Sequence, residues 1–221
     1  MITSRDNEKL KLVRKLHERR WREKLGLFVC EGEDLVAAAT AEPVELLVAG
    51  ENVEPRLLAE VSTAAHPPRV VGIYRRDDLP GAATRPVTLA LWRLADPGNV
   101  GTLIRAADAF GAAVALSEGC ADPTGPKALR ASAGSIWRVP LVPAGAGTRV
   151  ALVAHGGKPL GEADLEGETT FLVGAERDGL PAEVERDVDA WIPIGGAESL
   201  NAAVAGAIAL YEWRRQNGPG A

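Results

Sequence analysis

The chain has 221 residues, of which 46% are hydrophobic and 25% are charged, the balance of an ordinary globular protein. This composition excludes collagen and wholesale disorder, and the two distant cysteines, Cys30 and Cys120, exclude a disulfide scaffold and a zinc ribbon. No apolar run approaches the roughly 20 residues that a membrane helix needs, and no apolar signal segment follows the first residues, so we expect a cytoplasmic protein without a membrane partner.

The first 24 residues concentrate basic charge. They hold nine Lys and Arg against four Asp and Glu, a net charge of +5, which leaves −10 for the rest of a chain whose total is −5. Leu10, Val13 and Leu16 recur at helical spacing and predict a helix over residues 6–24. The cluster suits RNA phosphates, although a solvated helix face would carry the same charges. The RNA-binding candidates are Arg14, Arg19, Arg20 and Arg22, and Trp21 among them either stacks on a base or packs against the protein.

The residues that follow predict a small α/β unit. Three short apolar runs indicate strands, at 27–30, 44–48 and 70–73. Helices are expected at 35–39, with Asp34 as its cap, and at 55–65. A polar stretch rich in proline and glycine comes next, so we place a linker at 81–86 between an N-terminal domain, 1–80, and a C-terminal domain, 87–221.

Strands and helices alternate through the C-terminal domain, which predicts an α/β fold with a parallel sheet. The predicted strands are 87–91, 113–116, 139–142, 149–154, 170–173 and 190–194. The predicted helices are 99–110, 126–133, 181–187 and 200–215. On the last helix one apolar face is expected to be buried, formed by Leu200, Ala203, Val204, Ala207, Ile208 and Tyr211.

Three segments of this domain combine polar residues with turns after strands, where open α/β sheets bind ligands. The first opens a helix with Asp96-Pro97-Gly98-Asn99 and carries Arg105 further along. The second is Gly-x-Glu-x-x-Gly at 174–179, directly after an apolar strand. The third begins at Ile192-Pro193 and leads to Ser199, a natural N-cap for the last helix. Each segment taken alone also fits ordinary structure, with surface side chains at Arg105 and Glu176.

Taken together, the segments read Asn-x-Gly-x-x-x-Arg-x-x-x-x-Phe-Gly, then Gly-x-Glu-x-x-Gly, then Ile-Pro-x-x-Gly-x-x-Ser-Leu-Asn. Their order and spacing resemble the signature motifs of the SpoU (TrmH-type) RNA 2′-O-ribose methyltransferases of the SPOUT superfamily. The stretches 126–140 and 27–36 extend the resemblance to about residues 5–215. It implies a parallel-sheet SPOUT domain with a trefoil knot, preceded by a small L30e-like substrate-recognition domain. It also implies S-adenosylmethionine as cofactor, RNA as substrate, and a homodimer.

The resemblance also assigns site residues. Those matching the cofactor-binding positions are Gly174, Ile192, Ile194 and Leu200. Those matching the polar positions around the reacting ribose are Asn99, Arg105, Glu176, Ser199 and Asn201. Arginine's pKa above about 12 makes Arg105 better suited to stabilising a developing alkoxide and clamping a phosphate than to acting as a base. The reaction needs no metal, and the scattered histidines offer no metal-ligand spacing.

One departure from the family pattern is visible, because Ala203 stands where the family commonly has a second serine after Ser-Leu-Asn. The leading hypothesis is therefore an RNA 2′-O-methyltransferase, acting on ribosomal RNA more readily than on transfer RNA. An alternative is a non-catalytic RNA-binding protein on the same fold. A small-molecule enzyme with a Rossmann site is a third reading, which the missing Gly-x-Gly-x-x-Gly fingerprint disfavours.

Overall fold

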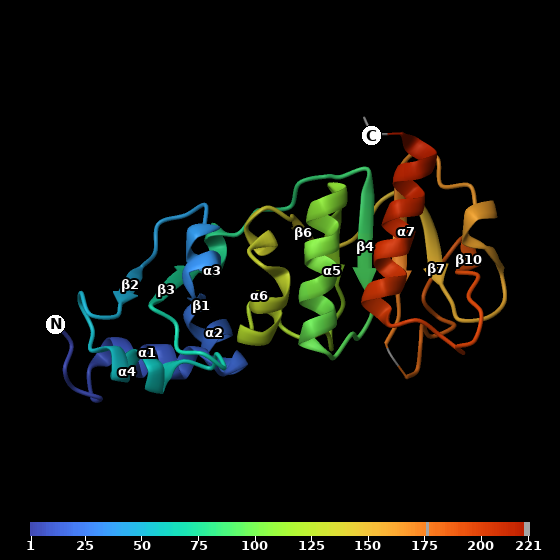
Figure 1. Cartoon of the computed structure of the whole chain (residues 1–221). Helices are drawn as coiled ribbons and strands as arrows, with labels where there is room; N and C mark the ends of the chain where they lie inside the picture. Colours follow the sequence, from blue (N-terminus) through green and yellow to red (C-terminus); the bar gives the residue numbers. More distant parts are fainter. Residues whose placement is uncertain (176, 219–221) are drawn as a thin grey trace.

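The structure is a computed structural model that describes residues 1–175 and 177–218. It contains two sheets side by side, a three-stranded sheet from the N-terminal third and a seven-stranded sheet from the remainder (Figure 1). No helix in the described part of the chain is both long and apolar enough to cross a bilayer.

The N-terminal sheet has the order β1-β3-β2 and is antiparallel throughout. Its strands are β1 Leu27–Glu31, β2 Glu45–Val48 and β3 Val70–Arg75. The helices of this unit are α1 Glu8–Leu16, α2 Arg19–Leu25, α3 Glu33–Ala37 and α4 Pro55–Val61. The apolar positions predicted on the first helix, Leu10, Val13 and Leu16, are fully buried against this sheet and α4.

The predicted helix over 6–24 is wrong in one respect, because the chain bends between α1 and α2. Glu18 takes an extended conformation, with φ −92° and ψ 132°. The Nη1 group of Arg22 then donates to the carbonyl oxygens of Leu16 and His17, at 2.9 and 2.8 Å, which caps the end of α1. The N-cap predicted at Asp34 is also wrong, since Gly32 precedes α3 and Asp34 lies inside the helix.

The large sheet is parallel, as predicted, and has the order β6-β5-β4-β9-β7-β10-β8. Its strands are β4 Val87–Leu91, β5 Ala113–Leu116, β6 Leu141–Val142, β7 Thr148–Leu152, β8 Lys158–Pro159, β9 Thr169–Val173 and β10 Val188–Trp191. The helices are α5 Pro97–Phe110, α6 Pro126–Ser132 and α7 Ala202–Asn217. Short 3₁₀ turns lie at Arg76–Asp78, Ser135–Trp137 and Leu160–Glu162.

Helices α5 and α7 lie side by side over one face of this sheet (Figure 1). Two glycines on helices allow the close packing: a Cβ on Gly101 would lie 2.2 Å from the carbonyl oxygen of Ala128 in α6, and a Cβ on Gly206 would lie 2.4 Å from Leu103. The carboxyl ends of the parallel strands point to the lower edge in Figure 1, and α1, α2 and α4 lie along the same edge.

Two expectations for the last third of the chain are wrong. Residues 181–187 form a turn rather than a helix, because Asp187 donates its backbone N–H to Arg149 and accepts from the Arg149 N–H at the start of β7. The buried face of α7 is formed by Ala203, Gly206, Ala209, Leu210 and Trp213. Val204 and Tyr211, predicted to be buried, are 46% and 59% exposed.

The N-terminal unit is joined to the large sheet by a buried ion pair. Arg22 Nε donates to Asp122 Oδ2 at 2.8 Å, and both side chains are only 5% exposed. Desolvation alone would raise the pKa of Asp122, but hydrogen bonds from Thr124 and the nearby Arg22 hold it below its usual value. Phe28 and Tyr74 of the N-terminal sheet also pack on Trp137, at ring distances of 5.5 and 4.9 Å.

Candidate active site

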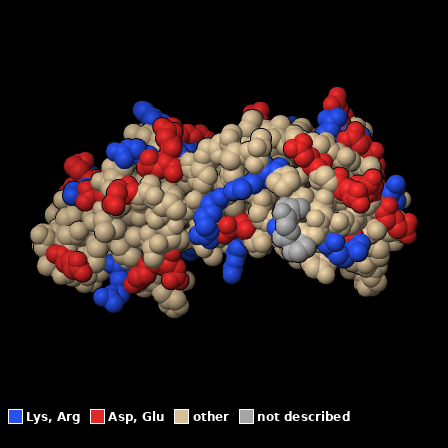
Figure 2. All heavy atoms as spheres, turned by 90° about the horizontal axis from the view of Figure 1, so that it is seen from above, with Lys and Arg blue, Asp and Glu red and all other residues tan. Residues whose placement is uncertain are grey.

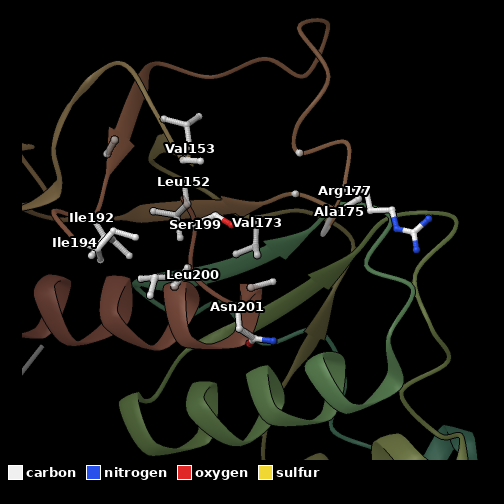
Figure 3. Close-up of a pocket in the computed structure, with 16 residues that line it drawn as sticks. Leu152, Val153, Val173, Ala175, Arg177, Ile192, Ile194, Ser199, Leu200 and Asn201 are labelled. Atoms are coloured by element: carbon white, nitrogen blue, oxygen red, sulfur yellow. The ribbon is translucent and has the colours of Figure 1, made fainter. Parts of the chain in front are cut away.

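A cavity of about 500 Å³ opens at the carboxyl ends of β7, β9 and β10 (Figure 3). Its walls come from residues 152–154, which end β7, from the turn after β9, and from the segment between β10 and α7. Leu152, Ile192, Ile194 and Leu200 supply apolar surface to the wall, and the Ser199 side chain adds a hydroxyl. This is the size and character of a pocket for a small organic ligand.

The turn after β9 is held in a fixed loop. Ala175 and Gly179 exchange two backbone hydrogen bonds, with N···O distances of 3.2 and 3.0 Å. A Cβ on Gly174 would lie 2.4 Å from the backbone carbon of Gly179, so only glycine fits there. The predicted residue Glu176 falls inside this loop but lies outside the described residues.

Asn201 fixes the start of α7 and ties it to α5. Its Oδ1 accepts from the backbone N–H of Ala203 and of Val204, at 2.8 and 3.3 Å, so Asn201 is the N-cap and the prediction of Ser199 in that role is wrong. Its Nδ2 donates to Oδ1 of Asn99 at 3.0 Å. The N-termini of α5 and α7, each with partial positive charge, therefore meet at the cavity.

The first turn of α5 is itself held by Asp96. The Asp96 carboxylate accepts from the backbone N–H of Asn99 at 2.9 Å and from Lys127 Nζ at 3.0 Å. The hydrogen bond from Lys127, followed by the one from Asn99, lowers the pKa of Asp96. The charge of Asp96 is thereby compensated, and Asn99 is presented at the end of the helix.

A second cavity of about 780 Å³ lies directly beside the first. The two share Ala175, Arg177, Gly179 and Asn201 as lining residues. The remaining wall comes from the segment between β4 and the first turn of α5 and from the loop after β9; its residues are Trp92, Arg93, Ala95, Asp96, Asn99, Asp178 and Pro181. Two ligands bound in these cavities would meet at Asn201, the arrangement that group transfer between two bound molecules requires.

The structure brings most of the predicted site residues together. Gly174, Ile192, Ile194, Ser199, Leu200 and Asn201 all line the first cavity, and Asn99 lines the second. Arg105 is different: it lies exposed on the outer face of α5 and lines neither cavity.

Sequence reasoning missed the contribution of β7 and of residues 92 and 93. Leu152–Ala154 line the first cavity because β7 lies between β9 and β10 in the sheet, an order that no local motif reveals. Arg177 lies at a variable position of the Gly-x-Glu-x-x-Gly motif, where the sequence carries no signal, and it lines both cavities. In Figure 3 its side chain extends from the loop away from the apolar wall.

Two known protein families match different parts of this chain. The model of the SpoU rRNA Methylase family matches residues 86–211, and that of the MRM3-like substrate binding domain matches residues 7–72. The chain belongs to the SpoU rRNA methylase family. The predictions of the family, the fold class, the SAM-dependent methyl transfer to a ribose 2′-hydroxyl of RNA and the enzyme class are confirmed. The SpoU match covers the seven-stranded sheet and both cavities.

Individual relatives of this SpoU protein are named as 2′-O-methyltransferases of 23S rRNA. The chain is 34% identical over 245 residues to the 23S rRNA (guanosine(2553)-2′-O)-methyltransferase RlmP of Bacillus subtilis, covering 96% of this chain and 98% of that protein. It is 35% identical to the 23S rRNA (uridine(2479)-2′-O)-methyltransferase of Streptomyces viridochromogenes, over 73% of this chain and 66% of the relative.

Solved structures match over nearly the whole chain. An AdoMet-bound rRNA methyltransferase from Sinorhizobium meliloti has a TM-score of 0.85 and 29% identity, covering 97% of each chain. AviRb from Streptomyces viridochromogenes, in complex with AdoMet, has a TM-score of 0.83 and 28% identity, over 95% of this chain and 98% of that one.

The first cavity of this SpoU protein fits S-adenosylmethionine. Its apolar side chains, among them Leu152, Ile192 and Leu200, suit the adenine ring, and the Ser199 hydroxyl suits a polar part of the ligand. In the described part of the chain, no group of three or more His, Cys, Asp or Glu side chains is placed to hold a metal ion.

The basic residues of the N-terminal unit divide into two groups. Arg14, Arg19 and Arg20 are at least partly exposed, and Arg19 also donates to the carbonyl oxygen of Cys120 at 3.1 Å. Arg22 is 4% exposed, and its Nε and Nη1 groups donate to Asp122 and to the end of α1. The prediction that Arg22 contacts RNA is therefore corrected: its guanidinium holds two parts of the protein together.

Proposed function

We propose that this protein transfers the methyl group of S-adenosylmethionine to a ribose 2′-oxygen of ribosomal RNA. The observation that carries the proposal is the pair of adjoining cavities that meet at Asn201, one shaped for the cofactor and one lined by Arg93 and Arg177. Two relatives that cover most of this chain are named as 23S rRNA 2′-O-methyltransferases, which favours ribosomal over transfer RNA. We propose the cytoplasm as its location, where ribosomal RNA would be available to it.

The proposed chemistry is an in-line displacement. With both ligands bound, the ribose 2′-oxygen would attack the methyl carbon of the sulfonium as the C–S bond breaks, S-adenosylhomocysteine would leave, and the hydroxyl proton would pass to water. The cofactor supplies the activated methyl group. Asn99 and Asn201 hold the ends of two helices at the reacting ribose, and Ser199 and Glu176 complete its polar surroundings in our proposal. Arg105 stabilises the developing alkoxide and the adjacent phosphate, since a guanidinium stays protonated.

The position of Arg105 supports a homodimer. Arg105 lies on the outer face of α5 and does not line either cavity of its own chain. The neighbouring helix α7 exposes Val204 and Tyr211, apolar surface that a second copy packed on this helix would cover. We propose that two copies pack through α5 and α7, so that Arg105 of each copy reaches the cavities of the other.

Intersubunit complementation tests this dimer. Arg105→Ala and Gly174→Ala should each be inactive alone, the first without the arginine and the second without cofactor binding. If Arg105 acts across the interface, one site of each mixed dimer is intact, and an equimolar, re-equilibrated mixture recovers about a quarter of the parent activity. A mixture that is as inactive as either variant, with subunit exchange verified, contradicts the proposal.

The RNA is proposed to approach along the lower edge in Figure 1, where α2 and the carboxyl ends of the large sheet lie together. Trp21 is partly exposed, and three cations lie 5.2 to 5.6 Å from its ring: Lys15, Arg20 and Lys24. An aromatic ring among cations suits a base and its phosphates. The opposite edge shows basic and acidic side chains mixed, with acidic ones prevailing over β7 and β10 (Figure 2).

We also propose two domains, with RNA recognition in residues 1–80, a linker at 81–86 and catalysis in 87–221. The two family matches, 7–72 and 86–211, support it. The trefoil knot stays a prediction from the resemblance.

The function is tested with labelled S-adenosylmethionine and unmodified ribosomal and transfer RNA. We expect label in ribosomal RNA, strongly reduced by Arg105→Ala, while cofactor binding measured by calorimetry is kept. Label in transfer RNA alone contradicts the substrate, and cofactor binding without label in any RNA favours the non-catalytic alternative.

A further inference from the structure

The second cavity contains two residues that come before the first family motif, Trp92 and Arg93. They directly follow β4 and bring the chain from the end of that strand toward the start of α5. The Trp92 N–H continues the sheet by donating to the carbonyl oxygen of Val173 in the neighbouring strand, at 2.8 Å. The position of these residues is therefore fixed by the sheet itself.

Arg93 has an unusual backbone conformation. Its φ of +49° lies in the left-handed region, which a residue with a Cβ enters only at a steric cost and which glycine enters freely. Among the described non-glycine residues, only Ala133 shares this property. Non-glycine residues held in this region cluster at functional sites, where the side chain is needed.

The surroundings of Arg93 hold its backbone and orient its side chain. The Arg93 N–H donates to the Ser117 hydroxyl at 2.9 Å, and Gly119 lies against the aliphatic part of the side chain, where a Cβ would come 3.2 Å from Arg93 Cγ. The guanidinium carbon lies 6.0 Å from the centre of the Trp92 ring. No carboxylate in the described part of the chain forms an ion pair with Arg93, so its charge is available at the cavity.

Trp92 carries a polar group without a hydrogen-bond partner among the described residues. Its Nε1 is buried and has no hydrogen-bond acceptor among the described residues, although buried donors are almost always paired. The ring lines the same cavity as Arg93. The cavity therefore combines an aromatic residue with two cations, Arg93 and Arg177.

The charge of the cavity favours an anion. Arg93 and Arg177 both line it, and of its two acidic residues Asp96 is already compensated by Lys127 at 3.0 Å. A volume of about 780 Å³ lies within the range of ligand sites. A nucleotide fits this combination, because an arginine can bind its phosphate and an aromatic side chain can contact its base.

We propose that Arg93 and Trp92 bind the target nucleotide, with Arg93 holding a phosphate and Trp92 contacting the base. The proposal rests on the proposed function, since the ribose of this nucleotide would then lie beside Asn201, where the two cavities join. Arg93 is a substrate-binding residue, and the strained backbone is kept because glycine at this position would supply no cation.

The test compares Arg93→Gly with Arg93→Asn, since asparagine is neutral and also accepts the left-handed conformation. Both should raise the KM for RNA by roughly tenfold or more, the effect of losing a hydrogen bond to a charged group. The Kd for S-adenosylmethionine and the kcat at saturating RNA should stay within about twofold of the parent. The Tm of Arg93→Gly should equal or exceed that of the parent, because glycine relieves the backbone.

Ala133→Gly is the matched control, because it relieves the other left-handed residue, which lies outside both cavities. It should leave the KM for RNA unchanged. If the parent methylates RNA and the KM of both Arg93 variants equals that of the parent, the assignment of Arg93 is overturned while the proposed function stands. A KM effect shared by Ala133→Gly overturns it as well.

A binding measurement separates this proposal from the enzymatic one. A fluorescent single-stranded oligoribonucleotide is titrated onto the full chain in the presence of S-adenosylhomocysteine. Weaker binding by both Arg93 variants supports the nucleotide site even if the parent transfers no methyl group, in which case it is the proposed function that fails. Equal binding by parent and variants overturns the site.

Discussion

Replacing Arg22 by methionine should destabilise the protein strongly without acting on RNA directly. Methionine keeps most of the length and apolar stem of the side chain but removes the guanidinium. Three hydrogen bonds are lost: the one to Asp122 at 2.8 Å and those to the carbonyl oxygens of Leu16 and His17 at 2.9 and 2.8 Å.

The size of the effect follows from what is left unpaired. Both charged side chains are 5% exposed, so Asp122 keeps a buried carboxylate whose remaining partners are Thr124 and, at 3.6 Å, Arg76. Breaking a buried ion pair by removing one partner costs about 3 to 5 kcal/mol. We expect a loss of about 4 kcal/mol in the free energy of unfolding, far more than the 0 to 1 kcal/mol of an exposed pair.

The assay is urea denaturation followed by tryptophan fluorescence and by far-ultraviolet circular dichroism, because two probes reveal whether the two sheets unfold together. Arg56→Met is the matched control, since Arg56 forms an exposed pair with Glu54 on the N-terminal unit. A loss below about 1 kcal/mol for Arg22→Met would refute the reasoning, because it would show that water replaces the buried contacts.

Four further results are expected. The pKa of Asp122 is lowered in the folded protein, so the stability that Asp122 contributes is present above the pKa of an ordinary carboxyl group, near 4, and is lost as the pH falls through the lowered pKa. Asp122→Asn should therefore reduce the loss of stability in acid, and an unchanged loss would assign the acid sensitivity to other groups. Gly174→Ala should abolish S-adenosylmethionine binding in calorimetry while the circular dichroism spectrum is kept, and normal affinity would show that the loop yields to a Cβ. Lys24→Ala should reduce the slope of log K for RNA against log salt by about one, and an identical slope would leave Lys24 as a solvated charge. Val204→Asp should shift the mass in sedimentation from dimer to monomer, and an unchanged mass would exclude α7 from the interface.

The sequence predicted the parts of the site that lie close together along the chain. The Gly-x-Glu-x-x-Gly turn and the segment from Ile192 to Asn201 each line the first cavity where the motif placed them. Local signals suffice there, because a strand, a turn and a helix start define the geometry within about ten residues. The parallel sheet followed from alternation in the same way.

Other features depend on contacts between distant residues. Arg22 is indistinguishable from Arg20 by sequence, yet Arg22 meets Asp122, one hundred positions away, and Arg20 is exposed. The buried face of α7 could not be identified because the first half of the helix, residues 202–209, consists almost entirely of small apolar residues, so periodicity there left two faces equally suitable. The sequence does not indicate a role for Arg93, because that role is inferred from its left-handed backbone conformation and its place in the second cavity.

The central claim is that the methyl group goes to a ribose oxygen of ribosomal RNA. The most direct measurement is mass spectrometry of nucleosides from unmodified 23S rRNA after incubation with the protein and deuterated S-adenosylmethionine. The account predicts one nucleoside whose deuterated methyl group remains with the sugar fragment and whose adjacent linkage resists alkali, both absent with Arg105→Ala. A deuterated methyl group on the base fragment would contradict the account.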